Sequence, residues 1–137
     1  MCTLLAKIQI HPGKEALFEQ VMAKMYEQTH ATESEVLRYE YWRGREPSFY
    51  YCLLSFTSNQ AFWEHQASDH HSGEMENFTA CIADLDLEVV DPVQGSSPLP
   101  ASNDDGPAAN AAPSVVEEAG NFPIAVSEWW QALKAAS

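Results

Sequence analysis

The sequence is short of basic residues and has no long apolar run. Only seven Lys and Arg stand against twenty Asp and Glu in 137 residues, so the formal net charge is −13. A nucleic-acid-binding protein needs a basic face that releases the counterions of the phosphates, and this composition does not supply one. An anionic membrane surface would repel the chain for the same reason. We therefore expect no nucleic-acid or membrane partner, and the acidity favours neutral or cationic ligands.

Cysteines and targeting signals are also scarce. Cys2, Cys52 and Cys81 are odd in number and form no CxxC motif, so we expect buried or free thiols rather than disulfides. No apolar run approaches the roughly 20 residues that span a bilayer. The N-terminus shows no basic segment followed by an apolar one. The sequence therefore predicts a cytoplasmic protein.

The apolar pattern of residues 1–91 predicts alternating strands and helices. Period-two alternation predicts four strands, at residues 3–10, 36–43, 49–56 and 84–90. An apolar stripe at helical spacing predicts a helix over residues 14–30. Ser58 is expected to cap a second helical region, which residues 68–71 interrupt. The order is β-α-β-β-α-β, an α+β, ferredoxin-like arrangement with an antiparallel four-stranded sheet.

In this arrangement the helices cover one face of the sheet and leave the other open. The predicted strand at residues 49–56 is apolar on both of its faces, because Phe49, Tyr51 and Leu53 alternate with other apolar side chains. The open face is therefore expected to be buried as well. A second copy of the chain is the simplest cover, so the sequence predicts a symmetric homodimer that pairs through the open sheet face.

The composition changes after residue 91. Residues 92–121 are rich in Pro, Ala and Ser and are predicted to form a linker. Residues 122–137 are predicted to be a docking tail, with a short helix that Ser127 caps and that carries Trp129, Trp130 and Leu133. Tryptophans are costly to leave in water, so we expect the tail to dock on its own domain or on a partner subunit.

Three of the five histidines lie within seven positions, at His65, His70 and His71. Histidine exchanges protons near neutral pH, and Asp69 could orient His65 if one helix contained both. Polar residues also gather where a helix breaks, so the alternative is that this cluster marks a break in the helix and has no chemical role. The spacing matches no HExxH or two-His-one-carboxylate pattern, and adjacent histidines point about 100° apart on a helix. We therefore predict no metal site.

Several short segments resemble the antibiotic biosynthesis monooxygenase domain family. The similar segments are HPGK at 11–14, LRYE at 37–40, FTSNQAFWEH at 56–65 and SDHH at 68–71. The resemblance covers residues 3–91 and implies a dimeric α/β barrel. It also implies that the chain oxygenates an electron-rich phenol, quinol or polyketide-like aromatic ligand without metal or flavin.

The resemblance further implies roles for individual residues. His65 would be the base or its orienter, with His70 as the alternative, and Tyr39 or Tyr51 would donate a hydrogen bond to the developing anion. The substrate would contact Leu17, Val21, Phe62, Trp63, His71 and Phe78.

Two other functions stay open at this stage. One is a non-catalytic module that binds a small molecule, with the tail tryptophans at the mouth of its pocket. The other is haem binding through His70 or His71. Haem-degrading relatives carry Asn and Trp where this sequence has Ala6 or Lys7 and Phe56, which weakens a haem-degrading activity.

Overall fold

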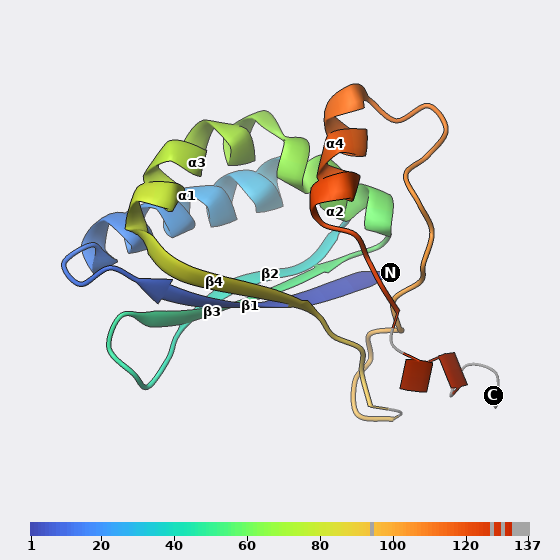
Figure 1. Cartoon of the computed structure of the whole chain (residues 1–137), viewed down its shortest axis with the longest axis horizontal. Coiled ribbons are helices and arrows are strands. Elements are labelled where there is room, and N and C mark those ends of the chain that lie inside the picture. Colours follow the sequence, from blue (N-terminus) through green and yellow to red (C-terminus); the bar gives the residue numbers. More distant parts are fainter. Residues whose placement is uncertain (94, 127, 130, 133–137) are drawn as a thin grey trace.

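A four-stranded antiparallel sheet forms the frame of the molecule (Figure 1). The computed structural model describes residues 1–93, 95–126, 128–129 and 131–132. The strands are β1 (Cys2–Ile10), β2 (Val36–Arg43), β3 (Phe49–Phe56) and β4 (Ile82–Val89). They lie in the order β2-β3-β1-β4, so β1 is central and pairs with both β3 and β4. The predicted strands are confirmed, with bounds shifted by at most two residues.

The helices are α1 (Glu15–Thr32), α2 (Asn59–Ala67), α3 (Asp69–Cys81) and α4 (Pro113–Asn121). All four lie on one side of the sheet, and α4 lies beside α2 (Figure 1). The order of elements through β4 is β-α-β-β-α-β, with the second helical region divided into α2 and α3. The predicted α+β, ferredoxin-like fold is confirmed.

The core lies between the sheet and the helices. Alternate residues of β1, such as Leu4, Ala6 and Ile8, are buried on the helix side of the sheet. From α1, Phe18 and Met22 project into the same core. A sheet face and a helix stripe that are both apolar bury each other in this way, which is why the two periods in the sequence predict one core.

Two serines determine where the second helical region breaks. Ser58 Oγ accepts the N–H of Ala61 at 3.0 Å and caps the start of α2, as predicted. Ser68 has extended backbone (ψ 151°), so α2 ends there, and its Oγ accepts the N–H of His71 at the start of α3. The break brings the last turn of α2 next to the first turn of α3, which places His65 near His71.

The face of the sheet opposite the helices has an apolar centre and charged edges. In strand order, one row of neighbours reads Trp42, Tyr51, Lys7 and Asp86, and the next reads Glu40, Leu53, Leu5 and Glu88. Trp42 is 59% exposed and Tyr51 is 38% exposed. Lys7 forms ion pairs with Asp86 at 3.6 Å and with Glu88 at 3.2 Å. This chain alone therefore leaves aromatic surface on β2 and β3 in contact with solvent.

The segment after β4 differs from the predicted linker, because it contains α4 and packs on the domain. Pro113 occupies the start of α4, where its missing N–H costs nothing. Val115, Ala119 and Phe122 recur at helical spacing and pack against the core. Asn59 donates to the carbonyl oxygens of Asn103 at 2.8 Å and Asp105 at 3.0 Å, which fixes the segment that leads to α4.

The predicted tail is only partly described. Trp129 is 50% exposed, and Ser127, Trp130 and Leu133 lie outside the described residues. All three cysteines are buried and free, as predicted. Burial raises the pKa of the Cys2 and Cys52 thiols to about 12, so both stay protonated at neutral pH. None of the helices in the described part of the chain has the length and apolar character needed to cross a membrane.

We expect Ser58→Ala to lower the free energy of unfolding by about 1 kcal/mol, because the Ala61 N–H loses its acceptor. Urea denaturation followed by circular dichroism measures this change. Ser58→Asp retains a side-chain oxygen at the cap and is the matched control, with stability near that of the wild type. Equal stability of Ser58→Ala and the wild type would contradict the capping role.

Candidate functional site

His65 is a buried imidazole that a carboxylate holds from one side. It projects from the last turn of α2 and is 1% exposed. Its Nδ1 lies 2.8 Å from Glu33 Oε2 and 3.1 Å from Glu33 Oε1. An ionised carboxylate can only accept, so His65 Nδ1 carries a hydrogen and donates it to Glu33. In the neutral ring Nε2 then holds a lone pair and is an acceptor.

Glu33 also contacts the second histidine of the group. His70 Nε2 lies 2.8 Å from the same Glu33 oxygen, 3.1 Å from Thr29 Oγ1 and 3.3 Å from Ser68 Oγ. Glu33 follows the C-terminus of α1, so three elements meet at this point. The possible ligand atoms of Glu33, His65 and His70 lie within 4.8 Å of one another, so these side chains could also hold a metal ion. The spacing of these three residues in the sequence does not indicate this arrangement.

Two imidazole nitrogens of the cluster are buried without a hydrogen-bond partner. They are His65 Nε2 and His71 Nδ1, and the two rings lie 5.0 Å apart in T-shaped contact. Burial, together with the neighbouring His65 and His70, lowers the pKa of His71 to about 3. His71 is therefore neutral at physiological pH. Buried polar atoms in proteins are nearly always paired, and a water or ligand is the usual partner of an atom that no protein group satisfies.

His65 and His71 line a pocket between the sheet and the helices. The pocket has a volume of ≈ 90 Å³ and is mostly apolar. It is lined by Ala6, Ile8, Tyr39, Tyr41, Cys52, Leu54, His65, Gln66, His71, Met75, Phe78, Leu85, Leu87 and Phe122. Glu33 is not among these residues, so it holds the Nδ1 atom of His65 from outside the pocket. Leu85 on edge strand β4 is 41% exposed, so one end of the pocket lies at the surface.

The polar part of the sheet side of this pocket consists of two tyrosines and a cysteine. Tyr39 and Tyr41 share a hydrogen bond of 2.7 Å between their hydroxyls, and the Tyr41 hydroxyl also interacts with the Cys52 thiol. Burial raises the pKa of both tyrosines, so both remain protonated. Tyr39, Tyr41 and Cys52 together carry three hydrogens on oxygen or sulfur, and two of these hydrogens serve the two contacts between the groups. One hydrogen remains for a ligand.

Several of the sequence-predicted residues lie at this pocket, and others do not. His65, His71, Tyr39 and Phe78 line it. His70 lies behind His65, on Glu33. Tyr51, the alternative hydrogen-bond donor, does not line the pocket: it pairs with Trp42 on the open face, and the adjacent Tyr50 is the buried one. Alternation could not decide between them, because β3 is apolar on both faces.

The remaining predicted wall residues belong to the core and are not among the lining residues. Leu17 and Val21 lie on α1, and Phe62 packs against Phe56. Trp63 donates from Nε1 to the carbonyl oxygen of Phe122 at 2.9 Å and so anchors the C-terminal segment. The expected partner of His65, Asp69, is replaced by Glu33, because Ser68 ends α2 before Asp69 and breaks the i, i+4 relation.

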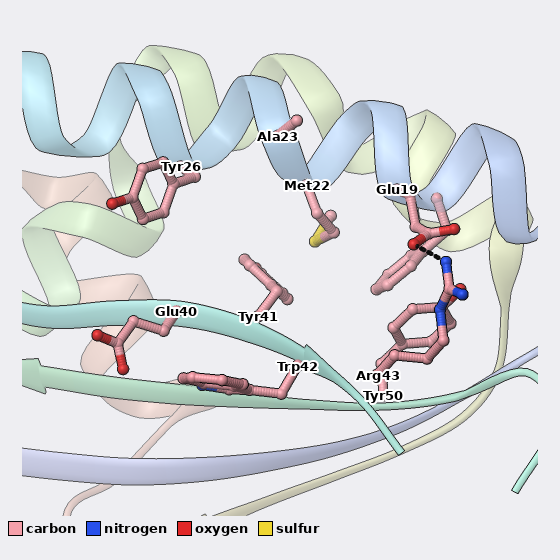
Figure 2. A pocket seen from close by; sticks show the side chains of 10 residues that line it. Glu19, Met22, Ala23, Tyr26, Glu40, Tyr41, Trp42, Arg43 and Tyr50 are labelled. Atoms are coloured by element: carbon pink, nitrogen blue, oxygen red, sulfur yellow. Dashed lines mark hydrogen bonds and ion pairs between the residues drawn. The ribbon is translucent and has the colours of Figure 1, made fainter. Parts of the chain in front are cut away.

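A larger groove lies elsewhere, between α1 and edge strand β2 (Figure 2). Its volume is ≈ 410 Å³, and Met22, Tyr26 and Tyr41 face into it. An ion pair between Glu19 and Arg43 closes one end. No histidine lines this groove, and none of the unpartnered nitrogens of the described residues opens onto it. The groove is larger than the pocket at His65, but it offers no histidine, so the chemistry favours the small pocket.

The sequence offered weak signals for the residues that were missed. Glu33 lies in a polar stretch that reads as the end of a helix, and only the folded chain brings it to His65. Tyr41 shares the alternation of Tyr39 and could have been grouped with it. Phe122 starts the segment that was predicted to dock, but its position in the pocket could not be derived from the pattern.

Comparison with known proteins identifies the region that carries this site. Residues 1–76 match the family model described as antibiotic biosynthesis monooxygenase. This span is more than half of the chain and includes Glu33, His65, His70 and His71. No curated protein matches the chain.

Solved structures match the same fold. A candidate antibiotic biosynthesis monooxygenase of Caulobacter crescentus superposes with a TM-score of 0.64 at 24% identity, over 68% of this chain and 90% of that chain. Rv0793 of Mycobacterium tuberculosis superposes with a TM-score of 0.63 at 15% identity, over 70% of this chain and 98% of that chain. PA3566 of Pseudomonas aeruginosa superposes with a TM-score of 0.62 at 18% identity, over 67% of this chain and 93% of that chain. Two thirds of this chain thus account for nearly all of each neighbour, which leaves no length in them for a segment like residues 92–137.

We expect the stability of the protein to fall as His71 titrates. The unfolded chain binds a proton at this histidine below about pH 6.5, whereas the folded chain, with the pKa lowered to about 3, does not. The contribution of His71 to the free energy of unfolding is therefore fully present above pH 6.5 and decreases toward pH 3. At pH 5 the decrease is about 2 kcal/mol.

The measurement is urea denaturation at pH 7.5 and pH 5 for the wild type and for His71→Leu, which cannot titrate. The carboxylates titrate in both proteins, so the difference between the two pH dependences isolates His71. Parallel curves for the two proteins would refute this account of His71.

Proposed function

The chain belongs to the antibiotic biosynthesis monooxygenase family, and from this premise we propose that it is a cofactor-independent monooxygenase acting on a phenolic, quinol or polyketide-like aromatic compound. The family and its structural neighbours support a monooxygenase-type activity. The substrate class and the independence from cofactors are our inference from the pocket.

The observation that carries the proposal is the unpartnered His65 Nε2 at an apolar pocket. Glu33 fixes the hydrogen of the ring on Nδ1, so Nε2 is the basic atom and faces the place where a ligand would bind. A carboxylate behind an imidazole also stabilises the imidazolium that forms when Nε2 takes a proton. This makes His65 the general base and Glu33 its positioning residue. His70, the alternative base, has its Nε2 engaged with Glu33, which favours His65.

The proposed reaction needs only a base, a donor and an apolar site. His65 Nε2 removes a proton from the substrate, and the resulting electron-rich anion supplies the electrons that reduce O₂. One oxygen atom enters the substrate as a carbonyl oxygen, the substrate loses two hydrogens, and the second oxygen atom leaves as water with them. The free hydrogen of the Tyr39–Tyr41–Cys52 chain can hold the anionic oxygen of the substrate. An apolar pocket strengthens both interactions because it excludes water.

The pocket volume favours a compact aromatic ring over haem. A pocket of ≈ 90 Å³ is far smaller than a macrocycle of four pyrrole rings, and His71 is one of the residues that line it. The cluster of Glu33, His65 and His70 is the one place in the described residues where a metal ion could contribute. The activity test therefore includes a chelator.

We also propose that the chain works as a homodimer through the open sheet face. The apolar centre at Leu53 and Tyr51 lies between rows of charge, and a two-fold partner would cover the exposed Trp42. Burial of such a face supplies the main driving force for association. Lys7 is already paired with Asp86 and Glu88, so its charge would not be buried alone.

The catalytic proposal predicts that His65→Ala slows the oxygenation of benzene-1,4-diols by about a hundredfold or more, as expected for loss of a general base. Glu33→Gln should lower kcat by roughly tenfold with little change in KM, because the base loses the carboxylate that stabilises its charged form. Uptake of O₂ after correction for spontaneous oxidation measures both effects.

Ser72→Ala, an exposed change on α3, is the matched control and should leave the rate unchanged. A chelator should also leave the wild-type rate unchanged. If the rate of the wild type equals that of His65→Ala, the base assignment fails, and if the chelator abolishes the activity, the reaction depends on a metal.

The dimer proposal predicts that Leu53→Glu converts a dimer to a monomer, because it places a charge at the centre of the pairing face. Light scattering after gel filtration at micromolar concentration measures the mass. Val116→Glu on α4, where Val116 is exposed away from the sheet, is the control and should remain dimeric. A monomeric wild type, or a dimeric Leu53→Glu variant, would refute the interface.

A further inference from the structure

The C-terminal segment makes a specific contribution to the pocket. The solved structures match 68% and 70% of this chain, which is about the length of the segment from β1 to β4. Residues 92–137 are therefore additional in length to the shared domain. Residues 103–124 of this addition lie on α2 and beside the sheet of the same chain (Figure 1). This segment therefore docks in cis, and it reaches the candidate site.

The contacts of the segment fix the position of Phe122. Val115 on α4 is buried, and the Ala108 N–H donates to Gln60 Oε1 at 2.9 Å. Trp63 Nε1 donates to the carbonyl oxygen of Phe122 at 2.9 Å. The Phe122 ring lies 6.2 Å from Phe62 in T-shaped contact and is one of the residues that line the pocket. Its backbone and its ring are thus both held at the pocket.

The volume of the pocket shows how the position of Phe122 limits the size of a ligand. With Phe122 in place the pocket measures ≈ 90 Å³, whereas an apolar cavity of about 150 Å³ is large enough for benzene. Entry of a single ring therefore requires a local widening of the pocket, and a fused two-ring compound does not fit while Phe122 stays. The Phe122 side chain is itself an aromatic ring at the edge of this space.

We propose that Phe122 determines which aromatic compounds the pocket accepts, because its phenyl ring occupies the position that the second ring of a fused two-ring hydroxyarene would take. The native chain is thereby selective for compounds with one ring. The identity of the ligand as a hydroxyarene rests on the proposed function, whereas the role of Phe122 in limiting size depends only on the pocket. The selectivity comes from a segment that lies outside the shared domain.

The test is the binding of phenol and of 2-naphthol, measured by isothermal titration calorimetry. Neither compound needs to be turned over, so binding is separated from oxygenation. In Phe122→Ala the second ring of 2-naphthol gains apolar burial that the wild type does not offer. The ratio of 2-naphthol affinity to phenol affinity should therefore rise by about tenfold or more. Phe122→Leu keeps an apolar side chain and should give a smaller rise in the same direction.

Val116→Ala on the exposed side of α4 is the matched control and should leave the ratio unchanged. A ratio within twofold of the wild-type value in folded Phe122→Ala and Phe122→Leu would overturn the inference. A ratio that rises while no hydroxyarene consumes O₂ supports the role of Phe122 and removes the proposed function. Oxygenation that depends on His65, with an unchanged binding ratio, supports the function and removes the role of Phe122.

Discussion

The pocket depends on one contact, the hydrogen bond between buried His65 and the carboxylate of Glu33. An imidazole that is removed from water loses the hydrogen bonds of its ring nitrogens to water. This loss destabilises the fold unless protein groups replace those hydrogen bonds. Glu33 satisfies Nδ1 only because the end of α1, the end of α2 and the start of α3 meet at one point. Nε2 is left unsatisfied on the side of the pocket. The same packing that stabilises the domain therefore produces a basic atom in an apolar space.

Most of the fold could be predicted from residues 1–91, since alternation in strands and helical spacing are local properties of the sequence. The interruption of the second helical region at residues 68–71 was also visible, because four polar residues break the apolar spacing there. The site was less accessible. Glu33 and His65 are 32 positions apart and meet only through the tertiary fold. Tyr51 and Tyr50 could not be told apart, because β3 has apolar residues on both faces, and the covering of each face is decided by other elements.

The C-terminal segment shows a second limit of pattern analysis. A composition rich in Pro, Ala and Ser describes a chain that is unable to form a core of its own, and the linker prediction followed from that. Val115, Ala119 and Phe122 do not need a core of their own, since they complete the one under α2. A small number of well-spaced apolar residues is enough when a neighbouring surface already exists, and this is how an appended segment becomes part of a site.

The central position of β1 has a consequence for the order in which the chain folds. β1 pairs with β3 and with β4, and β4 is the last strand to be synthesised. The β2–β3 hairpin is local and can form early, but the apolar N-terminal strand cannot be fully paired until residue 89 has left the ribosome. During that interval β1 presents an unpaired edge to other nascent chains. The segment that carries Phe122 follows β4 in the chain, so it leaves the ribosome after all four strands of the sheet.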